Sequence, residues 1–231
     1  MKRLFLYIAL IFMAVAPLKA QIEVQIGNTT SSDNGNFFPT QTYYNYSYTQ
    51  QIYYQSEIGG AMSIDKIAFQ YFYSTSYTRN LDIYLGHTTK GSFSTGNDYL
   101  YANEMTLVYS GNVTFSNAGA GYWCEIELNT SFAYNGVDNL VIAVDDNTGS
   151  YNNSSAKFYT NTSPGNSLYI YSDGTNYNPS SHTFTLNLSA YRNNIKLISS
   201  CTCCPPVLAV SDVTANAATL TWSVGEGNTA T

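Results

Sequence analysis

The acidic run Asp145-Asp146-Asn147-Thr148-Gly149 is the best candidate for an ion-binding site in the sequence. It directly follows a predicted buried strand, and Gly149 permits the chain to bend after it. Asp145 and Asn147 fall on one side of the predicted turn. Hard oxygen ligands at alternate positions suit Ca²⁺, so Asp145, Asp146 and Asn147 are the candidate metal ligands. The alternative is an Asx turn that closes a strand connection, because the run is shorter than an EF-hand loop and lacks its Glu.

The charge around this run supports the expectation of a bound cation. No Lys or Arg lies between Lys90 and Lys157, so nothing near in sequence neutralises the two adjacent carboxylates. Adjacent carboxylates repel each other and favour either a cation or protonation of one of them. Ca²⁺ is therefore the cofactor that the sequence suggests.

Aromatic side chains are the second candidate for ligand binding, because 22 residues are Tyr. A flat ring stacks on the C–H face of a sugar, and neighbouring Asn, Gln and Asp side chains bond its hydroxyls. Tyr151 and Tyr177 lie in polar loop sequences and are the tyrosines expected to be exposed to a ligand. The alternative is that the tyrosines pack within and between strands, where Tyr is a favoured residue.

Motifs for catalysis are scarce, and we expect no enzyme activity in this chain. The two histidines, His87 and His182, have no Gly-x-Ser-x-Gly elbow, His-Glu-x-x-His pair or phosphate-binding glycine loop to work with. His87 is expected to be an ordinary residue at a strand end. A hydrolase that uses two of the 15 acidic residues is the remaining alternative.

The candidate site residues lie between or beside short segments in which every second residue is apolar. Apolar residues recur at every second position in runs such as Ile67–Tyr73, Leu81–Leu85, Tyr122–Leu128 and Leu140–Val144, as in half-buried strands. Turn residues such as Asn135-Gly136 separate them. The pattern predicts an all-β fold, an antiparallel jelly-roll-like β-sandwich over residues 21–200 with no substantial helix. Cys124 alternates with core positions and is expected to face the core.

The first twenty residues have the pattern of a secretory signal. Lys2 and Arg3 precede a 13-residue apolar run, Leu4–Ala16, and cleavage is expected after Ala20. The run is too short to span a membrane, so we expect a secreted or cell-surface chain with no membrane insertion of the mature form. Cleavage removes three basic residues, leaving six against 15 acidic ones and a net charge of −9. That charge excludes nucleic-acid binding.

The composition changes after Ser200. Cys201-Thr202-Cys203-Cys204-Pro205-Pro206 is predicted to be a stiff linker over residues 201–206. Its three cysteines and Cys124 allow three pairings, among which the sequence does not choose. Residues 207–231 resemble the opening of a fibronectin type III domain, with Trp222 as its core residue. Such a domain has seven strands, so we expect this second sandwich to be truncated at Thr231.

Residues 40–198 also resemble a known family. The segments Tyr46–Tyr53, Arg79–Thr88, Met105–Gly111, Phe132–Val144 and Arg192–Leu197 occur in the order of the jelly-roll modules of exported Bacteroidetes surface proteins. They are similar to the cleaved-adhesin modules of gingipain-type proteins. The resemblance implies a non-catalytic adhesion module that binds surface or host glycans or proteins, in a family where some members bind calcium. A carbohydrate-binding accessory module, serving a secreted hydrolase that lies beyond Thr231, is the alternative.

Overall fold

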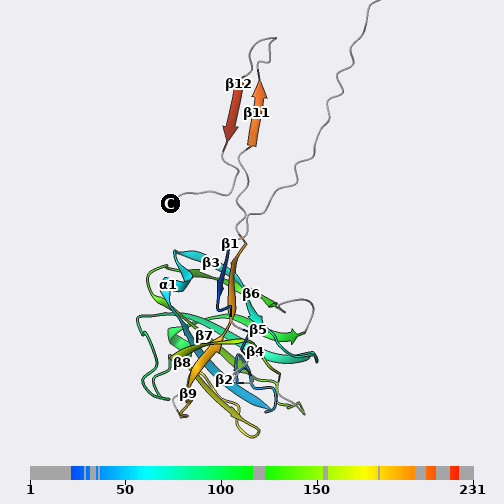
Figure 1. The fold of residues 1–231 in the computed structure, drawn as a ribbon, viewed down its shortest axis with the longest axis vertical. Coiled ribbons are helices and arrows are strands. Elements are labelled where there is room, and N and C mark those ends of the chain that lie inside the picture. Colours follow the sequence, from blue (N-terminus) through cyan, green and yellow to red (C-terminus); the bar gives the residue numbers. More distant parts are fainter. Residues whose placement is uncertain are drawn as a thin grey trace, which may run out of the picture. The chain divides into compact units, whose positions relative to one another are not determined.

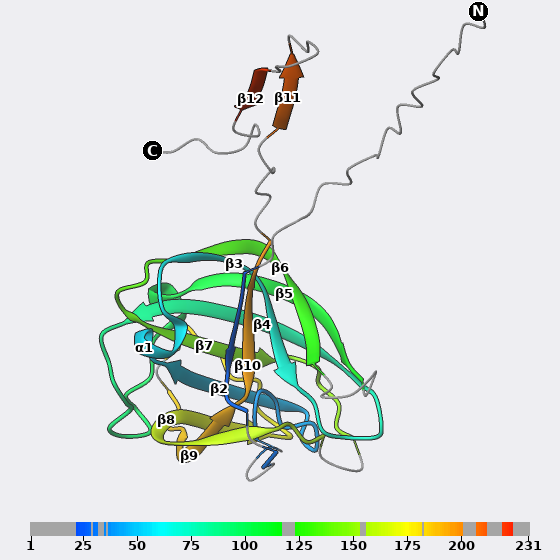
Figure 2. The same cartoon turned by 45° about the horizontal axis from the view of Figure 1, so that its top comes forward.

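Two antiparallel sheets make up residues 22–200 of the computed structural model (Figure 1; Figure 2). The structure describes residues 22–28, 30–31, 35, 37–116, 123–152, 156–181, 183–200, 207–211 and 219–223. The four-stranded sheet has the order β1-β10-β3-β6, formed by Ile22–Ile26, Ile195–Ser199, Met62–Gln70 and Trp123–Tyr134. The six-stranded sheet has the order β5-β4-β7-β2-β8-β9, formed by Thr106–Phe115, Tyr77–Thr88, Asn139–Asp146, Tyr46–Tyr53, Thr160–Ser172 and Asn187–Asn193.

The prediction of an all-β antiparallel sandwich is confirmed. Many neighbours in the sheets are distant in sequence, such as β7 between β4 and β2, so chain connections cross between the sheets. Helical structure in the described residues is limited to α1 (Gln55–Ile58) and the short 3-10 helix η1 (Ala102–Glu104). None of these described helices is long and apolar enough to cross a membrane.

The main core fills the space between the two sheets. Alternate residues of a strand point to opposite faces, and β3 contributes one side of this core while β4 and β7 contribute the other. Cys124 is half-buried and packs against this core, as predicted. The buried side chains include Ile64, Ile67, Phe69, Leu81, Ile83, Leu85, Leu140, Ile142 and Val144.

The outer face of the six-stranded sheet, which points away from the four-stranded sheet, carries a second core. Val141 and Ala143 of β7 point to this face and are buried with Tyr48 and Leu168. Residues 93–105, 177–181 and 183–186 are the covering segments, and they supply Phe93, Leu100 and Leu186 to it. The expectation that each strand is buried on one face only is therefore wrong for β7. An unbroken apolar run such as Leu140–Val144 is typical of a strand buried on both faces.

A buried glutamine fixes the covering segments to the sheet. Gln50 of β2 has no exposed surface, yet both ends of its carboxamide are bonded to the backbone of Leu100. Its Nε2 donates to the Leu100 carbonyl at 2.6 Å, and its Oε1 accepts from the Leu100 N–H at 2.9 Å. Because buried polar groups are costly unless paired, this contact holds residues 93–105 in one position on β2.

Residues 207–211 and 219–223 belong to a second unit, which is described separately from residues 21–200. In it, β11 (Val207–Ser211) pairs with β12 (Thr219–Ser223) in an antiparallel hairpin, with Leu208 opposite Trp222. The fibronectin type III-like character of this unit stays a prediction. The predicted signal peptide, residues 1–20, and the Cys/Pro linker, residues 201–206, lie outside the described residues.

Candidate functional site

A polar cleft opens on the outer face of the six-stranded sheet, beside the covering segments. Its volume is about 310 Å³, at the small end of the range for ligand sites. Three parts of the chain form it: strand β4, the end of strand β7, and the segment that follows β8. The lining residues are Asp82, Tyr84, Asp145, Asn147, Asn176, Tyr177, Asn178 and Pro179. We call this the Asp145 cleft.

Strand pairing brings two carboxylates together in the Asp145 cleft. β4 and β7 are antiparallel neighbours, and their register places Asp82 directly opposite Asp145. Side chains at directly opposed positions on one face are close neighbours, and like charges there are destabilising. None of the described residues that line the cleft is basic. The arrangement therefore places two acidic groups side by side without a basic partner in the cleft.

Asp145 is the most constrained residue of the cleft. Its side chain is only 3% exposed, and its Oδ2 accepts a hydrogen bond from Asn147 Nδ2 at 3.2 Å. Its Oδ1 is buried without any hydrogen-bond partner among the described residues. The pKa of Asp145 is raised to about 8, mainly by burial and also by the nearby carboxylates of Asp82 and Asp146, while the Asn147 hydrogen bond opposes the shift. Asp145 is thus a buried acid that lacks a partner for one oxygen.

Asp146 lies on the opposite face of the sheet from Asp145, where it is fully buried. Its Oδ2 accepts from Arg79 Nε of β4 at 2.7 Å and from the hydroxyl of Thr40. Its Oδ1 accepts from the N–H and the hydroxyl of Thr148 at 3.1 and 2.5 Å. The expectation that no basic residue neutralises this acidic run is therefore wrong for Asp146, because pairing of β4 with β7 supplies Arg79.

The predicted metal ligands are consequently divided between two environments. Asp145 and Asn147 stay together in the cleft, and Gly149, with a positive φ of 71°, turns the chain after them. Asp146 belongs to the buried ion pair and does not reach the cleft. Among the described residues, no group of three or more His, Cys, Asp or Glu side chains is placed to hold a metal ion. Calcium binding by this chain stays a prediction.

The two predicted ligand-binding tyrosines are also separated. Tyr177 lines the Asp145 cleft, donates its hydroxyl to the Tyr171 carbonyl at 3.2 Å, and packs edge-on against Phe184 at 5.2 Å. Tyr151 is 60% exposed, lies outside this cleft, and has its ring 6.4 Å from that of Tyr43. Only Tyr177 therefore shares a site with the acidic run.

Five cleft residues were not predicted as site residues: Asp82, Tyr84, Asn176, Asn178 and Pro179. Asp82 and Tyr84 alternate with the core residues of β4, so the sequence indicates that they share a face. It does not indicate that this face meets Asp145, because that depends on the pairing of β4 with β7. Asn176 and Asn178 flank Tyr177 in the sequence, and their position next to a predicted ligand-binding residue is the signal that could have identified them.

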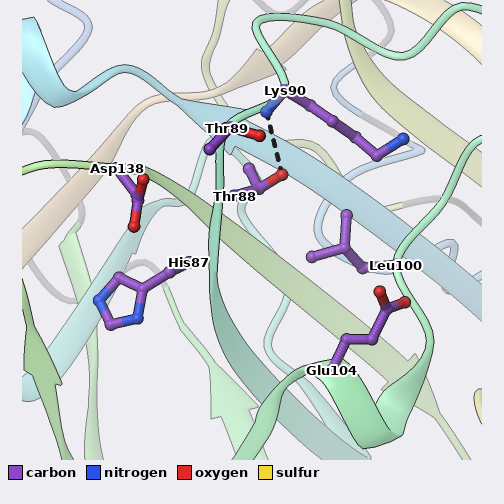
Figure 3. A pocket seen from close by; sticks show the side chains of 7 residues that line it. All are labelled: His87, Thr88, Thr89, Lys90, Leu100, Glu104 and Asp138. Atoms are coloured by element: carbon purple, nitrogen blue, oxygen red, sulfur yellow. Dashed lines mark hydrogen bonds between the residues drawn. The ribbon is translucent and has the colours of Figure 1, made fainter.

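A second cleft, of about 350 Å³, lies at the other end of β4 (Figure 3). His87 accepts the Asn135 N–H on Nε2 at 3.0 Å, and its ring packs 4.8 Å from that of Phe132. Figure 3 shows Asp138 and Glu104 on opposite sides of this cleft, with the Lys90 side chain directed away from His87. Within the described part of the chain, no hydrogen bond joins His87 to either acid. His182 lies outside the described residues.

Comparisons with known proteins give little further information. No protein-family model matches the chain, and no curated protein matches it. Among solved structures, it is similar to the crystal structure of the cysteine protease and lectin-like domains of Cwp84, a surface layer associated protein of Clostridium difficile. That match has 13% identity and a TM-score of 0.36, and it covers 67% of this chain. The chain spans about a third of the length of that protein, 32%.

Proposed function

We propose that residues 21–200 form a non-catalytic binding module of an exported cell-surface protein, and that the Asp145 cleft binds its ligand, a glycan. The observation that carries the proposal is the lining of the cleft. Two carboxylates, three carboxamides and two tyrosines converge there, beside the apolar cluster that covers part of the same sheet face.

The side chains of the cleft match the chemistry of a sugar. Carboxylates and carboxamides accept and donate hydrogen bonds to hydroxyl groups, and tyrosine rings pack against the C–H faces of the ring. Asp82 and Tyr84 are held by β4, and Asp145 by β7, so these polar groups are positioned by rigid strands. Preorganised groups of this kind lose little entropy when a ligand binds.

The other cleft supports a binding role over catalysis. A nucleophilic mechanism needs a base that is hydrogen-bonded both to a nucleophile and to an orienting group. His87 uses Nε2 to accept a backbone N–H, and Asp138 accepts from the Asn135 side chain at 2.7 Å. Glu104 caps the Tyr101 N–H at 2.8 Å. His87, Asp138 and Glu104 are therefore bonded to backbone or amide groups, and the hydrogen bonds to a nucleophile that catalysis would need do not occur among the described residues.

The sequence supports the extracellular setting. The basic start, the apolar run and Ala20 fit a secretory signal. The net charge of −9 for the mature chain disfavours nucleic acids and anionic membranes as partners. The resemblance of residues 40–198 to adhesion modules of exported proteins points to glycans or proteins at a cell surface as partners.

A glycan array tests the proposed function with two matched tyrosine variants. The wild-type chain should bind a defined set of glycans. Tyr177→Ala should weaken that binding about tenfold, because a lost aromatic contact is worth roughly 0.5–1.5 kcal/mol beyond its buried area. Tyr151→Ala removes a loop tyrosine outside the cleft and should bind like wild type.

Two outcomes would contradict the proposal. One is a wild-type chain that binds no glycan on the array. The other is loss of binding in Tyr151→Ala with full binding in Tyr177→Ala, which would move the site to the Tyr43–Tyr151 surface. Thermal melting of both variants checks that any loss does not come from unfolding, since Tyr177 also packs against Phe184.

A further inference from the structure

The Asp145 cleft contains acidic and hydroxyl groups that have no partner among the described residues. Asp145 Oδ1 is buried and unpartnered. The Asp82 carboxylate and the Tyr84 hydroxyl also line the cleft and have no hydrogen bond or ion pair with any described residue. A buried polar group without a partner costs about 1–3 kcal/mol, and more if it is charged. Such a group in a cleft is a reason to expect a ligand there.

A chain of side-chain hydrogen bonds fixes which Asp145 oxygen stays free. Asn176 Nδ2 donates to Asn147 Oδ1 at 2.8 Å, and Asn147 Nδ2 donates to Asp145 Oδ2 at 3.2 Å. This relay holds Oδ2 on the Asn147 side and leaves Oδ1 available. It also uses the carboxamide oxygen of Asn147, while the oxygen of Asn178 accepts from the Ser180 N–H at 2.9 Å.

The free acceptors fit an ammonium group better than Ca²⁺. Ca²⁺ takes six to eight oxygen ligands. The side-chain acceptors of the cleft without a partner among the described residues are fewer: the Asp82 carboxylate, Asp145 Oδ1, the Tyr84 hydroxyl and Asn176 Oδ1. A metal ion would keep most of its ligands as water. A primary ammonium group has three N–H donors, and the Asp82 carboxylate, Asp145 Oδ1 and the Tyr84 hydroxyl can each accept one of them. Tyrosine rings at the site also attract an organic cation.

We infer that the Asp145 cleft selects glycans that carry a free amino group, with the protonated amine of an amino sugar bound by Asp82, Asp145 and Tyr84. This inference rests on the proposed function and names its ligand class. An amino sugar is favoured over a lysine side chain because Asn176 and Asn178 line the same cleft. Their carboxamides can bond hydroxyl groups next to the amine, which a lysine lacks.

Isothermal titration with two hexasaccharides tests this inference. The first is a fully deacetylated glucosamine hexamer, and the second is its N-acetylated counterpart, which has the same rings without the charge. The wild-type chain should bind the glucosamine hexamer at least about tenfold more tightly, since hydrogen bonds to charged groups contribute about 1.5–3 kcal/mol. That preference should weaken as salt is added.

Charge-removing variants locate the effect. Asp82→Asn keeps the shape of the side chain, removes a repulsion with Asp145, and should abolish the preference for the amine. Asp138→Asn makes the same change in the His87 cleft and should leave the preference intact. Melting curves for both variants should show folded protein.

The outcomes separate this inference from the proposed function. Equal binding of both hexamers, unaffected by Asp82→Asn, would overturn the amine selection while glycan binding stands. Binding of neither hexamer would overturn the inference, and the glycan array then decides the proposed function separately. Two further arms identify other occupants. Binding of a lysine peptide in place of the hexamers would overturn the assignment of an amino sugar as the ligand. So would a melting temperature that Ca²⁺ raises in the wild type but not in Asp82→Asn.

Discussion

Replacing Arg79 with Met should lower the free energy of unfolding by about 3–5 kcal/mol. Arg79 and Asp146 are buried together, with 1% and no exposed side-chain surface, and Arg79 Nε lies 2.7 Å from Asp146 Oδ2. Removing one partner of a buried pair leaves the other charge uncompensated. Arg79 also donates to the carbonyls of Ser150 and Tyr44 at 2.7 and 2.8 Å, and these two bonds would be lost as well.

Urea unfolding at neutral pH measures this effect against a surface pair. Lys66 and Glu125 form an ion pair at 3.8 Å with side chains 30% and 49% exposed. Exposed pairs contribute about 0–1 kcal/mol, so Lys66→Met should change stability by less than about 1 kcal/mol. If Arg79→Met and Lys66→Met have equally small effects, Asp146 is not held by Arg79, and the assignment of the two aspartates to different environments is wrong.

Asp145→Asn should remove a pH dependence from the stability of the ligand-free protein. The pKa of Asp145 is raised to about 8 in the fold, against roughly 3.9 in an unfolded chain. Between these values the folded state holds a proton that the unfolded state has released. Stability must therefore fall as the pH rises from about 4 to about 8 and level off above that. The total loss is several kcal/mol at most.

The comparison of wild type with Asp145→Asn isolates this group from other titrations. The ionisable groups around Asp145 are Asp82 and Tyr84 of β4, Tyr48 of β2, Asp146 of β7 and Tyr177. All of these remain in the variant. Melting temperatures should be similar at pH 4 and should diverge towards pH 8, with the variant more stable. The buffers must be free of amines and must include a chelator, because a bound cation would mask the effect. Parallel curves would show that Asp145 titrates normally.

Much of the fold follows from the sequence because strand periodicity is a local property. The run Leu140–Val144 indicates a buried strand, and period 2 alone places Asp145 and Asp146 on opposite faces. The partners on those faces depend on non-local pairing. β4 supplies Arg79 to one face and Asp82 to the other, and no local pattern specifies that β4 pairs with β7.

The candidate site was predicted in part for the same reason. Tyr177 and the run from Asp145 to Asn147 were identified separately, each from its own loop sequence. Their convergence requires the segment after β8 to fold back over β7. The covering segments were not predicted, because their apolar residues, such as Phe93 and Leu100, have neither period 2 nor period 3.6. Without that cover, the sequence could not indicate that an apolar cluster lies on the outer face beside the cleft.

The central claim is that the Asp145 cleft is the ligand site of this module, and an NMR titration tests it most directly. Backbone amide signals of the isotope-labelled protein are followed while the glucosamine hexamer is added. We expect the largest shifts at residues 82–84, 145–147 and 176–178, with little change at Tyr43, Tyr151, His87 or Asp138. Shifts centred on the His87 cleft or on Tyr43 and Tyr151, or no shifts at all, would contradict it.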